Sequence, residues 1–275
     1  MFRKIADLQS EGKTSVLVTI TNTKGSTPRE VGAKMLVTRD KIEGTIGGGT
    51  LEWLAIERAR GLLESCENSK WSVPLCSKAH QCCGGFVELF FDIIKPRPRL
   101  LIFGAGHVGQ ALLEVMAGTQ YECKLVDERS QWIEEAQRKR FQLSHLALET
   151  FLKNPVEWFD DNPGWNFEET YAIVMTHDHG LDEAILEKLL GKPLRFLGLI
   201  GSQTKRQRFF SRLLEKGFPQ SQLEKISCPV GLPIGGKAPK EVALSIGAEL
   251  VQLYFLDLAK QEKQRVPVTI QEIQH

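Results

Sequence analysis

Arg99-Leu-Leu-Ile-Phe-Gly-Ala-Gly-His-Val-Gly-Gln110 is the stretch that decides the fold of the larger part of this chain. It reads as a buried apolar strand, then a Gly104-x-Gly106-x-x-Gly109 turn, then an apolar helix. A strand, a glycine turn and a helix in this order are the context that a dinucleotide-binding fingerprint requires. Gly104 would permit the tight turn, Gly106 would let the backbone approach a pyrophosphate, and Gly109 would let helix and strand pack closely.

A second apolar run, Cys123-Lys-Leu-Val-Asp127, follows at the expected distance and ends in a carboxylate. An acidic residue about 20 residues after the glycines commonly binds a ribose hydroxyl. Asp127 favours NAD, because a carboxylate repels a 2′-phosphate, while Arg129 leaves NADP open. The alternative is a nucleotide-binding fold that has lost its ligand.

Further apolar strands are expected at 172–176 and 196–201, with helical segments between them. Alternation of this kind predicts a parallel sheet covered on both faces, so this part is expected to be a Rossmann-like domain. The stretch 151–169 is expected to be an irregular loop or a short helix. A last helix is expected over about 239–262, starting with a proline in its first turn.

Lys95-Pro-Arg-Pro98 marks the expected domain boundary, because two prolines in four residues favour an extended connector. Residues 1–95 mix expected strands (15–23, 34–38, 41–45, 71–75 and 85–94) with two helices (1–10 and 51–64). The fold class is therefore α/β: an N-terminal α+β domain over 1–95, then a Rossmann-like parallel-sheet domain with a C-terminal helix over 96–275.

The composition of the 275 residues is that of an ordinary globular protein, with 42% hydrophobic and 25% charged residues. A net charge of +1 argues against bulk attraction to nucleic acid or to a membrane. No apolar run reaches the roughly 18 residues of a membrane span, and the start lacks the apolar centre of a signal peptide. From these two observations we expect a cytoplasmic location. Six cysteines in a chain of this length do not make a disulfide scaffold, and in a reducing compartment we expect them to be thiols.

The N-terminal domain holds three glycine-rich turns, Gly25–Arg29, Gly32–Lys34 and Gly44–Glu52. Three consecutive glycines, Gly47, Gly48 and Gly49, come before a helix and would leave backbone N–H groups free to form an anion nest. Arg29 and Lys34 could supply countercharge. The alternative is a sharp turn at a helix entry.

Gln81-Cys82-Cys83-Gly-Gly85 precedes an expected strand and does not have the spacing of a zinc finger. Vicinal thiols on a glycine-rich turn can present a thiolate to a soft metal or to sulfur chemistry. Two small buried residues at a strand entry are the competing interpretation, and spacing alone does not separate the two.

Two further groups follow expected strands of the parallel sheet. His177, His179 and Asp182 crowd one turn and could hold zinc, manganese or iron, although Asp182 could simply cap its helix. Ser202, Lys205 and Arg206 begin a basic helix, and cations in its first turn oppose the helix dipole. Such a cluster is expected if an anionic group binds there. A solvated basic face is the alternative for this second group.

Taken together, these motifs resemble those of the XdhC/CoxI family, the accessory proteins of xanthine dehydrogenase and related molybdenum hydroxylases. The resemblance covers nearly the whole chain. The motifs that carry it are Gly25-Ser-Thr-Pro-Arg29, Gly32-Ala-Lys-Met35, Gly44-Thr-Ile-Gly-Gly-Gly-Thr-Leu-Glu52, Gln81-Cys-Cys-Gly-Gly85, Gly104-Ala-Gly-His-Val-Gly109, Met175-Thr-His-Asp-His179, Leu199-Ile-Gly-Ser202 with Lys205-Arg206, and Cys228-Pro-Val-Gly-Leu-Pro233 with Lys237-x-Pro239.

The resemblance implies a chaperone more than a catalyst. Such a protein binds the molybdenum cofactor (molybdopterin), protects it during sulfuration and passes it to an apo-hydroxylase of the xanthine dehydrogenase type. It also implies a cysteine desulfurase partner and a homodimer. From the residues, two other functions stay open: an NAD(P)-dependent oxidoreductase, and a metal-dependent hydrolase built on His177, His179 and Asp182.

Overall fold

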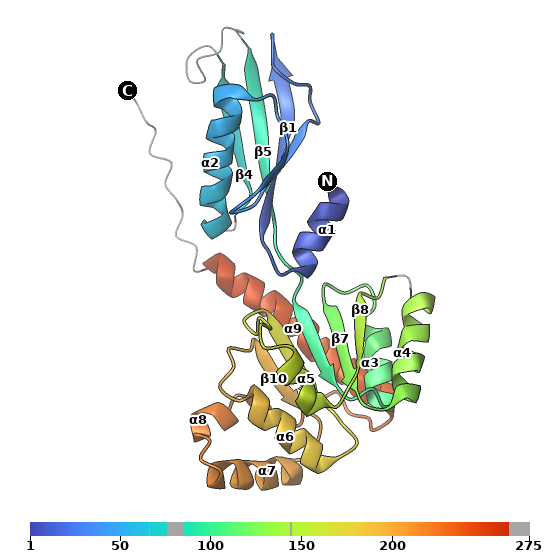
Figure 1. The fold of residues 1–275 in the computed structure, drawn as a ribbon. Coiled ribbons are helices and arrows are strands. Elements are labelled where there is room, and N and C mark those ends of the chain that lie inside the picture. Colours follow the sequence, from blue (N-terminus) through green and yellow to red (C-terminus); the bar gives the residue numbers. More distant parts are fainter. Residues whose placement is uncertain (66, 76–84, 144, 264–275) are drawn as a thin grey trace. The chain divides into compact units, whose positions relative to one another are not determined.

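The computed structural model describes residues 1–65, 67–75, 85–143 and 145–263, and it divides into two compact units, Met1–Arg97 and Pro98–His275 (Figure 1). The division falls within Lys95-Pro-Arg-Pro98. Each unit has a sheet and a core of its own.

The described residues of the N-terminal unit form an antiparallel sheet of five strands in the order β3-β2-β1-β5-β4. Alternate residues of β1 point to opposite faces, as the period of two in a strand dictates. Val16, Val18 and Ile20 face α2, while Leu17 faces α1. The elements are α1 (Phe2–Ser10), β1 (Ser15–Lys24), β2 (Lys34–Val37), β3 (Ile42–Gly44), α2 (Gly49–Ser65), β4 (Ser69–Pro74) and β5 (Phe86–Ile94).

In the second unit, the part of the chain that the structure describes forms a parallel sheet of six strands in the order β11-β10-β9-β6-β7-β8. Numbered from its first strand, this is the 3-2-1-4-5-6 order of dinucleotide-binding folds, with the order reversing between β6 and β9. Its strands are β6 (Arg99–Phe103), β7 (Glu122–Asp127), β8 (Leu148–Leu152), β9 (Thr170–Val174), β10 (Phe196–Leu199) and β11 (Ile226–Ser227). The predicted Rossmann-like fold is confirmed.

Helices cover both faces of this sheet. One face packs against α3 (His107–Met116), α4 (Ser130–Gln142) and α9 (Pro239–Lys263). The other packs against α5 (Pro155–Asp161), α6 (His179–Leu189), α7 (Gln203–Glu215) and α8 (Gln220–Leu223). The helices that directly follow a strand start near the carboxyl ends of the strands, which is the edge where ligands bind in open α/β sheets.

Candidate functional site

Three loops of the N-terminal unit meet at one end of its sheet, and we call Gly25–Arg29, Gly44–Gly49 and Gly85 the loop cluster. A Cβ added at Gly85 would lie 2.1 Å from the Ser26 carbonyl oxygen, and one added at Gly47 would lie 2.6 Å from Pro28 Cβ. Both approaches are possible only because these residues lack a side chain. Two predicted glycine-rich turns and the end of the Cys82-Cys83 segment are thus adjacent in space.

Arg29 lies beside the triple glycine, with its Cγ 3.3 Å from the position of a Cβ at Gly47, and its side chain is exposed. Lys34 lies on β2 and its Nζ donates a hydrogen bond to Thr19 Oγ1 at 3.3 Å. Arg29 is therefore the better placed of the two predicted cations to meet an anion at the loop cluster.

Glu52, which is not among the predicted site residues, organises the glycine loop. Its Oε2 accepts hydrogen bonds from the Ile46 N–H at 2.9 Å, from the Gly48 N–H at 3.1 Å and from the Thr45 hydroxyl. Partial burial acts to raise the pKa of Glu52, but these hydrogen bonds outweigh it and lower the pKa. The loop thus differs from the predicted open nest, because a carboxylate of the chain itself already takes part of its N–H groups.

Cys82 and Cys83, the predicted thiol pair, lie outside the described residues. The residues that flank their segment are fixed: the Leu75 N–H donates to the Gly85 carbonyl oxygen at 2.8 Å, beside the paired start of β5. Both flanks therefore belong to the end of the sheet that carries the loop cluster.

In the second unit, the glycine turn after β6 has the geometry that its sequence predicts. Gly104 has φ +114°, and a Cβ there would lie 2.4 Å from the Met175 carbonyl oxygen. A Cβ at Gly109 would lie 2.3 Å from the Gly104 carbonyl oxygen, so α3 packs directly on the turn. Gly106 is open, with Arg129 Nη2 at 3.9 Å from the Cβ position.

Asp127, the predicted ribose contact, is 3% exposed and fully engaged within the chain. Its carboxylate accepts from the Ala105 N–H at 2.7 Å, from the Arg129 N–H at 2.9 Å, and from Arg129 Nε and Nη2 at 2.8 and 2.7 Å. Burial acts to raise its pKa, but the bonds from Arg129 and Ala105 prevail and lower it. Asp127 therefore fixes the turn. The NAD(P)-dependent oxidoreductase stays a prediction, which titration with NAD(H) followed by turnover assays tests.

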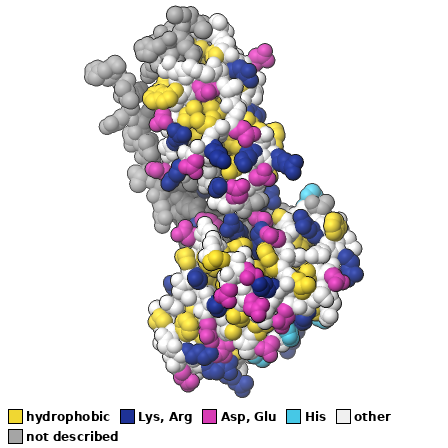
Figure 2. Space-filling view, viewed as in Figure 1, with side chains coloured by type: hydrophobic (Ala, Val, Ile, Leu, Met, Phe, Trp, Pro, Cys, Tyr) yellow, Lys and Arg dark blue, Asp and Glu magenta, His cyan; other side chains and the backbone are white. Residues whose placement is uncertain are grey.

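A basic pocket of about 510 Å³ lies at the carboxyl ends of β9 and β10, between the starts of α6 and α7. Figure 2 shows Lys and Arg side chains gathered over α7 at the bottom of the view. Ser202 caps α7 by accepting the Lys205 N–H at 3.2 Å. The residues that line the pocket are Thr176, His179, Ile200, Gly201, Ser202, Thr204, Lys205, Arg208, Phe209 and Arg212.

Lys205 and Asp182, predicted for two different sites, form one ion pair. Lys205 Nζ lies 2.6 Å from Asp182 Oδ2, and Asp182 Oδ1 also accepts from the Thr176 N–H and hydroxyl at 2.9 and 2.7 Å. The side chains are 12% and 1% exposed, so each neutralises the other in a poorly hydrated place. This carboxylate explains why a lysine is tolerated in the first turn of α7.

This arrangement gives no support to the metal hypothesis on His177, His179 and Asp182. The Asp182 carboxylate is committed to Lys205 and Thr176, while both histidines are exposed and His179 packs edge-on against Phe209 at 6.2 Å. Among the described residues, no group of three or more His, Cys, Asp or Glu side chains could hold a metal ion.

The three arginines of α7 that follow Lys205 have different surroundings. Arg206, a predicted contact, stacks on Phe210 at 4.5 Å and does not line the pocket. Arg212, which is not among the predicted contacts, lines it and pairs with Glu183 at 2.6 Å. Arg208 lines it as an exposed cation. Arg208 and Arg212 are four residues apart, so they lie on the same face of α7. This spacing is the feature of the sequence that could have predicted that both line the pocket.

The architecture defines a class: an antiparallel α+β unit with a glycine loop cluster, joined to a Rossmann unit of dinucleotide-binding strand order. Comparison with known family models identifies the same two parts of the chain. The model of the XdhC Rossmann domain matches residues 100–250, and the model of the XdhC and CoxI family matches residues 8–72. The chain therefore belongs to the XdhC/CoxI family.

Individual relatives extend the comparison. The uncharacterised protein YqeB of Escherichia coli (strain K12) is 31% identical over 260 residues, which cover 92% of this chain and 46% of YqeB. A probable xanthine dehydrogenase subunit of Bacillus subtilis (strain 168) is 30% identical over 165 residues, which cover 60% of this chain and 46% of that protein. The chain spans about half the length of these curated relatives.

Among solved structures, one described as a xanthine dehydrogenase from Bacillus halodurans aligns with a TM-score of 0.51 at 20% identity. The alignment covers 96% of this chain and 97% of that one, and at this identity it shows the fold alone. Within the described ranges, none of the helices has the length and apolar character needed to cross a bilayer.

Proposed function

We propose that this protein binds the molybdenum cofactor as cargo, shields it during sulfuration and delivers it to a molybdenum hydroxylase of the xanthine dehydrogenase type. Family membership supports the class of partner, since one relative is named as a probable component of xanthine dehydrogenase. A cysteine desulfurase is the proposed sulfur donor, and a homodimer is the proposed assembly.

The observation that carries the proposal is the meeting of the loops in the loop cluster. The cargo has two chemically distinct ends, a phosphate and a molybdenum bound by sulfur. An exposed Arg29 beside Gly47 can hold a phosphate through two parallel hydrogen bonds. Thiolates are the side chains that suit a soft, sulfur-bound metal, and the Cys82-Cys83 segment is flanked by Leu75 and Gly85 at this end.

Glu52 gives the loop the stiffness that such a site requires. Its carboxylate holds the Ile46 and Gly48 N–H groups, so the glycine loop is ordered before any cargo arrives. Preorganisation of this kind lowers the entropic cost of binding. In this proposal Glu52 is a positioning residue, and Arg29 is the residue that binds the phosphate.

The test is retention of the cofactor by protein purified from cells that make molybdopterin. We expect the wild type to release a fluorescent oxidised pterin on acid treatment, and Arg29→Ala, Cys82→Ala and Cys83→Ala each to retain at least about tenfold less. Arg60→Ala is the matched control, because Arg60 is exposed on α2 and pairs with Glu57. Wild-type protein without pterin, or variants that all retain it equally, would overturn the proposal.

A further inference from the structure

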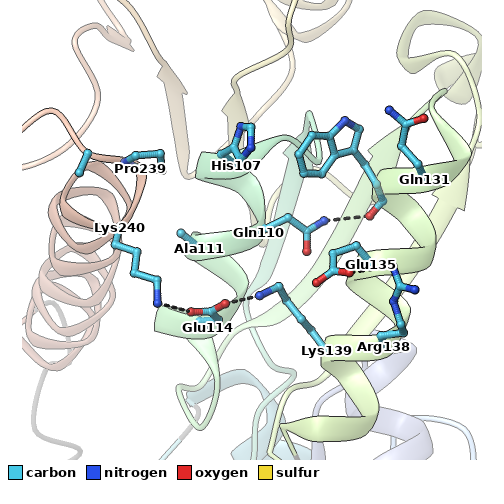
Figure 3. A pocket seen from close by; sticks show the side chains of 12 residues that line it. His107, Gln110, Ala111, Glu114, Gln131, Glu135, Arg138, Lys139, Pro239 and Lys240 are labelled. Atoms are coloured by element: carbon cyan, nitrogen blue, oxygen red, sulfur yellow. Dashed lines mark hydrogen bonds and ion pairs between the residues drawn. The ribbon is translucent and has the colours of Figure 1, made fainter.

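A second cavity, of about 630 Å³, lies in the Rossmann unit between the helices on one face of the sheet (Figure 3). Its walls come from α3, α4 and the start of α9, and no residue of the Gly104–Gly106 turn lines it. The volume falls in the range of small-molecule sites. It is separate from the basic pocket at α7 and belongs to a unit that does not contain the loop cluster.

Gln110 lines the cavity, and its side chain carries a buried hydrogen-bond acceptor that has no partner in the described part of the chain. Gln110 is 5% exposed, and its Nε2 donates to the Ala105 and Trp132 carbonyl oxygens at 3.0 and 2.8 Å. These two bonds fix the orientation of the amide, because reversing it would set an oxygen against two carbonyl oxygens. Gln110 Oε1 is then left without a hydrogen-bond partner among the described residues.

Figure 3 shows where this oxygen points. The amide lies between α3 and α4, with its nitrogen on the α4 backbone and its oxygen toward the side of Glu135 and Lys139. Buried polar atoms are nearly always satisfied in native proteins. An acceptor held in a fixed direction on a side chain that lines a cavity therefore invites an N–H or O–H donor from a ligand.

The surroundings favour a flat, partly apolar ligand. Trp132 is half-buried and meets the His107 ring edge-on at 4.9 Å, and Ala111 adds a small buried surface. Aromatic side chains stack well on planar heterocycles. The charged side chains at the rim are already paired with one another: Glu114 with Lys139 and Lys240, and Glu135 with Arg138.

We propose that this cavity binds a planar nitrogen heterocycle with N–H donors, stacked on Trp132 and hydrogen-bonded to Gln110 Oε1. Purine nucleotides and reduced or oxidised pterins share this chemistry. The proposal goes beyond the loop cluster and does not depend on it, since the two places lie in different units and use different residues.

The test is calorimetric titration of the full chain with adenosine 5′-monophosphate, with 6-hydroxymethylpterin, and with ribose 5-phosphate as the base-free control. We expect at least one heterocycle to bind at least about tenfold more tightly than ribose 5-phosphate. Binding of the purine alone identifies a nucleotide as the source, and binding of the pterin alone identifies a pterin. If neither binds better than ribose 5-phosphate, the proposal is wrong.

Variants and modified probes then locate the contact. Trp132→Ala should weaken the heterocycle about tenfold, whereas Trp53→Ala, an exposed tryptophan of the other unit, should leave it unchanged. N6,N6-dimethyladenosine 5′-monophosphate, or 1,3-dimethyllumazine in the pterin case, lacks the N–H donor and should bind about tenfold more weakly. These probes test Gln110 without altering the protein, so misfolding of a Gln110 variant cannot obscure the result.

Two outcomes would contradict the assignment: equal losses in the two tryptophan variants, or equal binding of the probes with and without the donor. The loop cluster is tested independently. Arg29→Ala should reduce pterin retention in cells and leave the calorimetric binding at Trp132 unchanged. A failure of one proposal is therefore distinguishable from a failure of the other.

Discussion

Individual carboxylates in this protein are used to fix loops at the places where the sequence predicts ligand contacts. Asp127 sits at the position of a ribose contact and binds Ala105 and Arg129 instead. Glu52 fills part of a glycine loop that reads as an anion nest. In both cases the sequence shows the carboxylate and the residues that supply the backbone donors. Which donors the carboxylate binds depends on the orientation of its side chain in the folded protein.

Asp127→Asn is the residue-scale prediction. The variant should lose about 2 kcal/mol of unfolding free energy at pH 7, since a charged hydrogen-bond partner of Arg129 is removed. The pKa of Asp127 is lowered in the folded state, so its contribution is complete above the unfolded value of about 3.9 and is lost as the pH falls through the folded pKa. The difference in unfolding free energy between wild type and variant should therefore begin to shrink as the pH falls below about 4.

Urea unfolding at a series of pH values measures this gap. Glu128→Gln is the control, because Glu128 is the exposed neighbour of Asp127. A gap that stays constant down to pH 3 (roughly one unit below the unfolded pKa) would show that the charge of Asp127 is not the stabilising feature.

At the scale of elements, the strand–turn–helix unit around Gly104 follows directly from its sequence, while the short edge elements do not. The expected strands at 172–176 and 196–201 correspond to β9 and β10. The stretch expected to be a loop or a short helix forms α5, whose Trp158 is 1% exposed and packs against Phe103 and Phe151. Long apolar strands can be predicted from the pattern of their own residues. In contrast, α5 and the two-residue β11 are stabilised by packing against neighbouring elements, which the local sequence does not show.

Two glycine substitutions within helices test the packing of these elements. Gly109→Ala should destabilise the protein by about 2 kcal/mol, because the new Cβ would meet the Gly104 carbonyl oxygen at 2.3 Å. Gly61→Ala on α2 has nothing within 4 Å and should stabilise it by about 1 kcal/mol, through helix propensity. Thermal or urea unfolding reports both changes, and equal effects of the two substitutions would contradict the close approach of α3 to the turn.

At the scale of the molecule, each unit is complete in its own core. The N-terminal unit buries Val18, Leu51 and Phe91 between its sheet and α2. The Rossmann unit buries separate clusters on the two faces of its sheet, around Leu100 and around Phe103. Cores that do not depend on each other are the physical definition of domains that fold alone.

We therefore expect residues 1–97 and 98–275 to fold when each is produced separately. Overlay of the amide spectra of each fragment on the spectrum of the whole chain measures this, and most resonances should coincide. A fragment without dispersed resonances would show that its core needs the other unit.

The sequence by itself determined the class of fold, the boundary near Lys95-Pro-Arg-Pro98 and the backbone roles of Gly104 and Gly109, because these depend on local sterics and periodicity. Tertiary structure decided which side chains meet. It joined Lys205 to Asp182, turned Asp127 toward Arg129 and left Gln110 Oε1 without a partner among the described residues. Side-chain pairing of this kind depends on approach across the fold, between segments that the spacing of residues along a chain does not relate.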